Sequence, residues 1–148
     1  MKRIVIGLDG TQKDHGIVAW IGDFATEVGA QVIAAHFVPR ASVWMIAGAQ
    51  IDCDAYFDEL REHFDDDVLV PLQARIGAVP VHVQAGDPAR ELAAIAHRSA
   101  ADLIAIGAPD HTAVHDVVFG SGERRLLHLA DVPVISVPSQ VRHMRLVR

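Results

Sequence analysis

Five short apolar runs, separated by longer segments with helical periodicity, constrain the fold of this 148-residue chain more than any other feature. Runs of this length and composition indicate strands whose two faces are both covered. Strands that alternate with helices form a parallel sheet with helices on both faces. The five predicted strands are Ile4–Leu8, Gln31–Val38, Val79–Ala85, Asp102–Ile106 and Val132–Val137.

The order of these strands follows from the handedness of their connections. Because crossovers between parallel strands are right-handed, we expect an open, doubly wound α/β sheet of five parallel strands in the order 3-2-1-4-5. Pro133 lies within the last run, and proline in a strand indicates a sheet edge. The length suits a single domain, which we place at residues 1–140, followed by a basic C-terminal tail at 141–148.

Helix signals lie between the predicted strands. Asp14 is expected to cap the first helix, and Asp87 followed by Pro88 is expected to start the helix before the fourth strand. The last helix is predicted from about Gly120 to Ala130.

The region between the second and third strands is less regular. Residues 39–51 are interpreted as a loop. A long helix is predicted from about Asp52, with apolar residues at every fourth position. Pro71 should kink or interrupt this helix, because proline removes a backbone donor and clashes with the preceding turn.

The overall composition restricts the functional class. The formal net charge is −6, which argues against a partner such as duplex nucleic acid, because that binding needs a basic face. Cys53 is the only cysteine, so no internal disulfide can form and a reducing compartment is expected. No apolar run approaches the roughly 20 residues of a membrane span, and the apolar run near the N-terminus is too short for a signal peptide. We therefore expect a cytoplasmic protein that does not enter a membrane.

The predicted strand order also places a binding site. In sheets of this kind, ligands bind outside the carboxyl ends of the strands where the order reverses, here between the first and fourth strands. The loop Asp9-Gly10-Thr11 and the loop after Ile106 should therefore share one crevice, with Val38 beside it.

Glycines near this crevice indicate an anion site. Gly107 allows a sharp backbone turn and the close approach of a ligand. Gly120 and Ser121 are predicted to start a helix, whose free N–H groups and dipole favour a phosphate or another anion. The same pair also suits an ordinary N-terminal cap, and the spacing alone leaves both interpretations open.

Taken together, these segments resemble the universal stress protein family from Ile4 to Val137. Nucleotide-binding members of that family carry G-x-x-G, nine residues, and then G-S or G-T. This chain has Gly107-Ala108-Pro109-Asp110, nine residues, and then Gly120-Ser121. The similarity extends to Leu8-Asp9-Gly10-Thr11, Gly86-Asp87-Pro88, residues 101–107 and Asp131-Val132-Pro133-Val134.

The resemblance implies an adenine-nucleotide-binding regulatory protein of the stress response, with ATP as its ligand, alone or with Mg²⁺. Carried over by position, Asp9 would lie near the ribose or a metal, and Val38 and Ile106 would contact adenine. Gly107 would approach the ribose and phosphates. The implied phosphate-binding residues are Gly120, Ser121 and Gly122. The family also implies a homodimer that pairs its last strands, and at most slow ATP hydrolysis.

Two departures from the family pattern favour an alternative. Asp110 replaces the second glycine of the motif, where its side chain would limit close approach and its charge would repel phosphates. Two like charges about 4 Å apart cost on the order of 4 kcal/mol at an effective dielectric of about 20. Residues 111–119 contain no Lys or Arg. The alternative is a nucleotide-free dimeric interaction module of the same fold that has lost ATP binding.

Other chemistries lack their sequence signatures. The chain has no G-x-S-x-G, no Walker lysine motif, and no G-x-G-x-x-G after its first strand. No catalytic residue is therefore assigned. His111 and His115 are four residues apart, but we interpret them as surface polar residues and predict no metal site. His36 is interpreted as a hydrogen-bonded core histidine.

Overall fold

A sheet of five parallel strands organises the chain. The computed structural model describes residues 1–108 and 116–140, with the backbone alone at 116–121. The strand order is β3-β2-β1-β4-β5, which confirms the predicted doubly wound α/β topology. The strands are β1 (Arg3–Gly7), β2 (Gln31–Val38), β3 (Val81–Ala85), β4 (Leu103–Gly107) and β5 (Val134–Val137).

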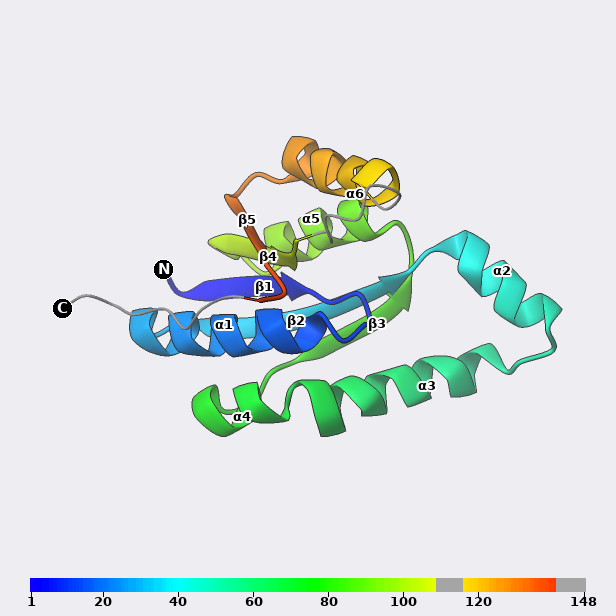
Figure 1. Cartoon of the computed structure of the whole chain (residues 1–148), viewed down its shortest axis with the longest axis horizontal. Helices are drawn as coiled ribbons and strands as arrows, with labels where there is room; N and C mark the ends of the chain where they lie inside the picture. The colour runs from blue at the N-terminus through cyan, green and yellow to red at the C-terminus, as the bar shows by residue number, and fades with distance from the viewer. Residues whose placement is uncertain (109–115, 141–148) are drawn as a thin grey trace.

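Helices cover both faces of this sheet (Figure 1). On one face lie α1 (Asp14–Val28) and α4 (Val70–Ile76), and on the other lie α5 (Pro88–Arg98) and α6 (Asp116–Leu129). The chain between β2 and α4 forms α2 (Arg40–Gly48), α3 (Cys53–His63) and a π-helical turn, η1 (Phe64–Val68). Within the described residues, no helix is both long and apolar enough to span a bilayer.

The core is divided by the sheet into two layers. Because side chains alternate along a strand, Ile4 and Ile6 of β1 face α1 and α4, whereas Val5 faces α5 and α6. These three side chains are fully buried, as expected for a central parallel strand.

Residues 39–51, predicted to be a loop, contain helix α2 instead. Pro39 has extended dihedrals and precedes the helix, where a proline is compatible with helix entry. No further Gly or Pro follows until Gly48, which is the last helical residue. The prediction was wrong because apolar residues without a buried stripe were interpreted as irregular structure.

The long helix predicted from about Asp52 is interrupted, but before Pro71. Asp52 caps α3 and accepts hydrogen bonds from the N–H groups of Asp54 and Ala55. The regular helix gives way to the π-helical turn at Phe64, and Pro71 lies in the first turn of α4. A proline in a first turn loses no intrahelical hydrogen bond, so the interruption is compatible with it.

The last strand lies at a sheet edge, as predicted, but it is shorter than predicted and leaves Pro133 outside. Pro133 comes directly before β5, and its carbonyl accepts a hydrogen bond from the Ile104 N–H at 3.0 Å. β5 pairs with β4 and is the terminal strand in the sheet order. The basic tail at 141–148 lies outside the described residues.

Candidate functional site

A crevice opens at the carboxyl ends of β1 and β4, where the strand order reverses. It encloses about 190 Å³. The predicted meeting of the β1–α1 loop with the end of β4 is thus present in the structure. The described lining residues are Gly7, Leu8, Asp9, Lys13, Asp14, Ala35, Phe37, Pro88, Ala89, Leu92, Ile106, Gly107, Ala108, Gly122, Glu123 and Leu126.

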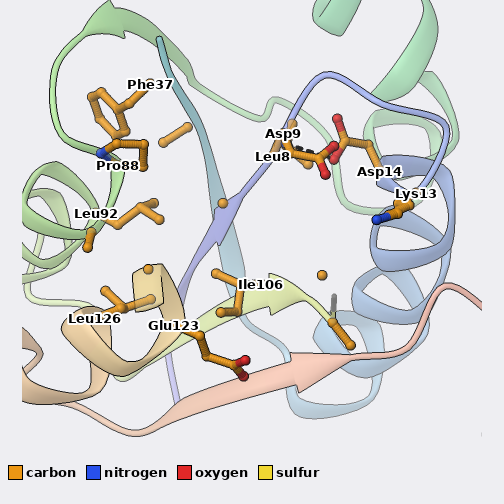
Figure 2. Close-up of a pocket in the computed structure, with 16 residues that line it drawn as sticks. Leu8, Asp9, Lys13, Asp14, Phe37, Pro88, Leu92, Ile106, Glu123 and Leu126 are labelled. Atoms are coloured by element: carbon orange, nitrogen blue, oxygen red, sulfur yellow. Dashed lines mark hydrogen bonds between the residues drawn. The ribbon is translucent and has the colours of Figure 1, made fainter. Parts of the chain in front are cut away.

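One end of the crevice is apolar. Figure 2 shows Phe37 of β2, Leu92 of α5 and Leu126 of α6 gathered on one side, with Ile106 of β4 beside them. Phe37, Leu92 and Leu126 are buried and belong to the core layer under α5 and α6. The apolar end is therefore an open continuation of that core layer, and it suits a flat aromatic ring.

Phe37 is a lining residue that the sequence interpretation missed. Val38 was expected at this position, and it is buried, but it is not among the residues that line the crevice. Neighbouring side chains on a strand point to opposite faces, so Phe37 and Ala35 face the crevice and Val38 does not. The alternation along β2 was the signal that identifies Phe37.

Gly7 is a glycine that close packing requires. A Cβ atom at this position would lie 2.8 Å from Cδ1 of Leu92 and 3.2 Å from Cγ2 of Ile106. Any side chain at Gly7 would therefore displace the walls of the apolar end.

The other end of the crevice carries carboxylates. Asp14 is only 3% exposed, and its two carboxylate oxygens accept hydrogen bonds from the N–H groups of Asp9 (3.0 Å) and Gly10 (2.8 Å). The Asp9 carboxylate in turn accepts from the N–H and the hydroxyl of Thr11, at 2.8 and 2.6 Å. Figure 2 shows Asp9 and Asp14 together at this end, with Lys13 beside them. Carboxylates thus take up the backbone donors of the β1–α1 loop.

Asp14 does not cap its helix, contrary to the sequence prediction. It is the first residue of α1, and Lys13 precedes it without a side-chain cap. The Asp14 side chain turns back to the loop, where two consecutive N–H groups donate to its two carboxylate oxygens. Burial is the largest cause that raises the pKa of Asp14 from 3.8 to about 7, and the nearby charge of Asp9 acts in the same direction.

The loop conformation depends on Gly10. Its φ is +81°, which lies in the left-handed region where glycine is favoured. The Nδ1–H of His36 donates a hydrogen bond to the Leu8 carbonyl at 2.8 Å and so holds the start of this loop. His36 is partly buried and hydrogen-bonded, which confirms its interpretation as a structural histidine.

Helix α6 begins earlier than predicted. It starts at Asp116, so the backbone at Gly120 and Ser121 lies within the helix and not at its N-terminus. Glycine inside a helix costs only about 1 kcal/mol relative to alanine, so a glycine need not mark a boundary. The prediction that these two residues start the helix was therefore wrong, and with it the argument that their free N–H groups form an anion site. The next predicted residue, Gly122, does line the crevice.

Of the remaining predicted site residues, some line the crevice and others do not. Ile106 and Gly107 line the crevice, and a Cβ atom at Gly107 would meet open space. Gly10 and Thr11 belong to the loop beside it but do not line it. Asp110, together with His111 and His115, lies outside the described residues.

The described crevice is more acidic than basic. Asp9, Asp14 and Glu123 line it, together with Lys13. Arg125 of α6 instead holds Asp87 at the start of α5 through two hydrogen bonds, one of them 3.1 Å long. Asp87 is the N-cap residue of α5 and Pro88 is its first helical residue, as predicted, but the Asp87 side chain makes no cap hydrogen bond. Among the residues that the structure describes, no group of three or more His, Cys, Asp or Glu side chains is arranged to hold a metal ion.

Comparisons with known proteins agree with this architecture. A family model described as the universal stress protein family matches residues 1–138. A stress response protein, NhaX of Bacillus subtilis (strain 168), is 22% identical over 160 residues, which cover 91% of this chain and 96% of that protein.

Solved structures of universal stress proteins have the same fold. One in complex with cAMP aligns with a TM-score of 0.65 and 19% identity, over 94% of this chain and 98% of the other. One from Archaeoglobus fulgidus in complex with dAMP aligns with a TM-score of 0.64 and 20% identity, over 93% and 98%. At these identities, the structural likeness shows the fold alone.

Proposed function

The chain belongs to the universal stress protein family, and we propose that its crevice binds an adenine nucleotide, as a regulatory step in a stress response. The observation that carries this proposal is the division of one crevice into an apolar end and a polar end. An adenine ring suits the space between Phe37, Leu92 and Leu126, and the ribose would then lie toward Asp9. Relatives of the same fold were solved with cAMP and dAMP, which supports this class of ligand.

ATP is the nucleotide that we propose within this class. Ile106, Gly107 and Gly122 line the crevice together with the residues of its two ends, and a Cβ atom at Gly107 would meet open space, so the phosphates would extend past this glycine. The described carboxylates do not form a metal cluster, so a divalent ion such as Mg²⁺ would arrive with the phosphates. We assign no catalytic residue, and slow hydrolysis is the most that this arrangement supports.

The experiment is to denature the freshly purified protein and identify the small molecules released by mass spectrometry. Titration calorimetry of the emptied protein with ATP, ADP, AMP and cAMP, each with and without Mg²⁺, would follow. We expect saturable binding of at least one adenine nucleotide, with GTP weaker. An empty protein that binds none of them would refute the proposal.

The second candidate is a nucleotide-free dimeric interaction module. The acidic lining at Asp9, Asp14 and Glu123 is the observation that favours it, because phosphates would meet negative charge there. Asp110→Gly distinguishes the two candidates, since it restores the family glycine. Tighter ATP binding by this variant would support a weakened nucleotide site, whereas absence of binding in both proteins would support the interaction module.

We also propose a homodimer that pairs through β5 and a location in the cytoplasm. Among the described residues, β5 is the terminal strand of the sheet, and the backbone groups on its outer edge could pair with β5 of a second copy. Sedimentation at micromolar concentration tests the dimer, and a monomer would contradict it.

A further inference from the structure

Helix α2 stands apart from the layers that cover the sheet. Figure 1 shows it at one end of the molecule, beyond the carboxyl ends of the strands, and it packs against α3. Neither α2 nor α3 contains a buried residue. We call α2, α3 and the π-helical turn, residues 40–68, the arm.

The arm concentrates exposed apolar side chains. Of the eight large hydrophobic residues that are exposed in the described part of the chain, three lie within residues 44–51. Trp44 and Met45 are the two most exposed of the eight, at 78% and 71%, and Ile51 is 50% exposed. Single exposed apolar residues are normal, but a group that includes an exposed tryptophan indicates an interaction surface.

The arm also carries the whole net negative charge of the protein. Its eight Asp and Glu residues and two Arg residues give a formal charge of −6, which equals that of the whole chain, so the rest of the chain is neutral. Two of the carboxylates have basic neighbours on the arm, Asp58 with Arg61 at 3.1 Å and Asp67 with His63 at 3.6 Å. The remaining excess of carboxylates creates a local negative potential beside the apolar group.

We propose that the arm is a docking surface for a basic amphipathic helix of a partner protein. Such a helix would place its apolar side chains on Trp44, Met45 and Ile51, and its Lys and Arg residues against the carboxylates of α3 and the π-helical turn. The same negative charge disfavours an anionic membrane or a nucleic acid, and two acidic arms would repel each other in a symmetric pair. This surface is separate from the crevice and does not depend on nucleotide binding.

The test uses the full-length protein and a synthetic helix of about 20 residues, with Lys on one face and Leu on the other. Binding is followed by anisotropy of the labelled peptide and by tryptophan emission. Trp20, the other tryptophan, is stacked on Phe24 of α1 and serves as a constant background. We expect saturable binding with a blue shift of Trp44 emission, and the double variant Trp44→Ser, Met45→Ser should weaken it about tenfold or more.

Matched controls separate docking from general charge attraction. Leu127→Ser removes a comparably exposed apolar side chain from α6 (57%) and should change the affinity less than about twofold. The triple variant Asp54→Asn, Glu59→Gln, Glu62→Gln should weaken binding and reduce its salt dependence, whereas Glu27→Gln on α1 should not. All these side chains are exposed or half-buried, and circular dichroism checks that each variant is folded.

Three results would overturn the proposal. A peptide of the same composition without a helical face that binds equally well would indicate charge attraction alone. Undiminished binding by the Trp44, Met45 variant would remove the apolar contact. Self-association of the protein that this variant abolishes would assign the surface to a second copy of the chain.

Discussion

The two ends of the crevice are built by different means. At the apolar end, Phe37, Leu92 and Leu126 are held by a strand and two helices, and they are part of the core. At the acidic end, the β1–α1 loop is held by Asp14 and Asp9, whose carboxylates occupy its backbone donors. The comparison teaches that the apolar end depends on packing and should be insensitive to pH, whereas the acidic end depends on charge and should respond to it.

The largest expected effect is at the apolar end. Phe37→Ala should lower the free energy of unfolding by about 3–5 kcal/mol, because it leaves a cavity in a buried position. It should also abolish measurable nucleotide binding. Val38→Ala is the matched control, since Val38 is equally buried and does not line the crevice. Urea unfolding and calorimetry measure both effects, and a loss of affinity in the Val38 variant instead would restore Val38 as the adenine contact.

The acidic end should make stability depend on pH. The folded pKa of Asp14, about 7, lies above its ordinary value of 3.8, so the folded state binds more protons between these values. Asp14 therefore contributes stability that is fully present below about pH 4 and is lost as pH rises through about 7. The loss amounts to up to about 4 kcal/mol. The stability of Asp14→Asn relative to the wild type should rise with pH across this window.

Urea unfolding at half-unit pH steps measures this difference. Asp54→Asn is the control for the loss of one negative charge, because Asp54 is an exposed carboxylate of α3, outside the β1–α1 loop. Parallel profiles for Asp14→Asn and the wild type would mean that the buried carboxylate does not titrate in this range.

A smaller effect is expected from Glu123, which lines the crevice from α6. Glu123→Gln removes one negative charge from a half-buried position, so ATP should bind about three- to tenfold more tightly, and adenosine should change little. Calorimetry with both ligands at low and high salt checks this difference. Equal gains for ATP and adenosine would show that the effect is not electrostatic.

The smallest effect is expected at the ion pair between Arg125 and Asp87, which joins α6 to the start of α5. Arg125 is about half exposed, so solvent screens the pair. Arg125→Ala should cost about 0.5–1 kcal/mol of unfolding free energy, with a weaker effect in high salt. A loss above about 2 kcal/mol would show that the pair does more than align the two helices.

The sequence predicted the topology because its signals were redundant. Each strand is an apolar run, and the handedness of crossovers leaves few orders for five of them. The crevice followed from that order. Its polar end did not, because the role of Asp14 depends on a loop conformation that places two N–H groups beside its side chain. The choice between Phe37 and Val38 was available from strand alternation, whereas the start of α6 was obscured by two glycines that the helix tolerates.

The buried Asp14 carboxylate has a consequence for how the empty protein behaves. Because its two oxygens accept hydrogen bonds from the N–H groups of Asp9 and Gly10, the β1–α1 loop is held by the protein's own side chain before any ligand arrives. In many ligand-binding proteins, such a loop becomes stable only when a ligand binds to the folded state. Here the loop should resist proteolysis in the empty protein. The rise in melting temperature when a nucleotide saturates the crevice should therefore come from contacts at the apolar end.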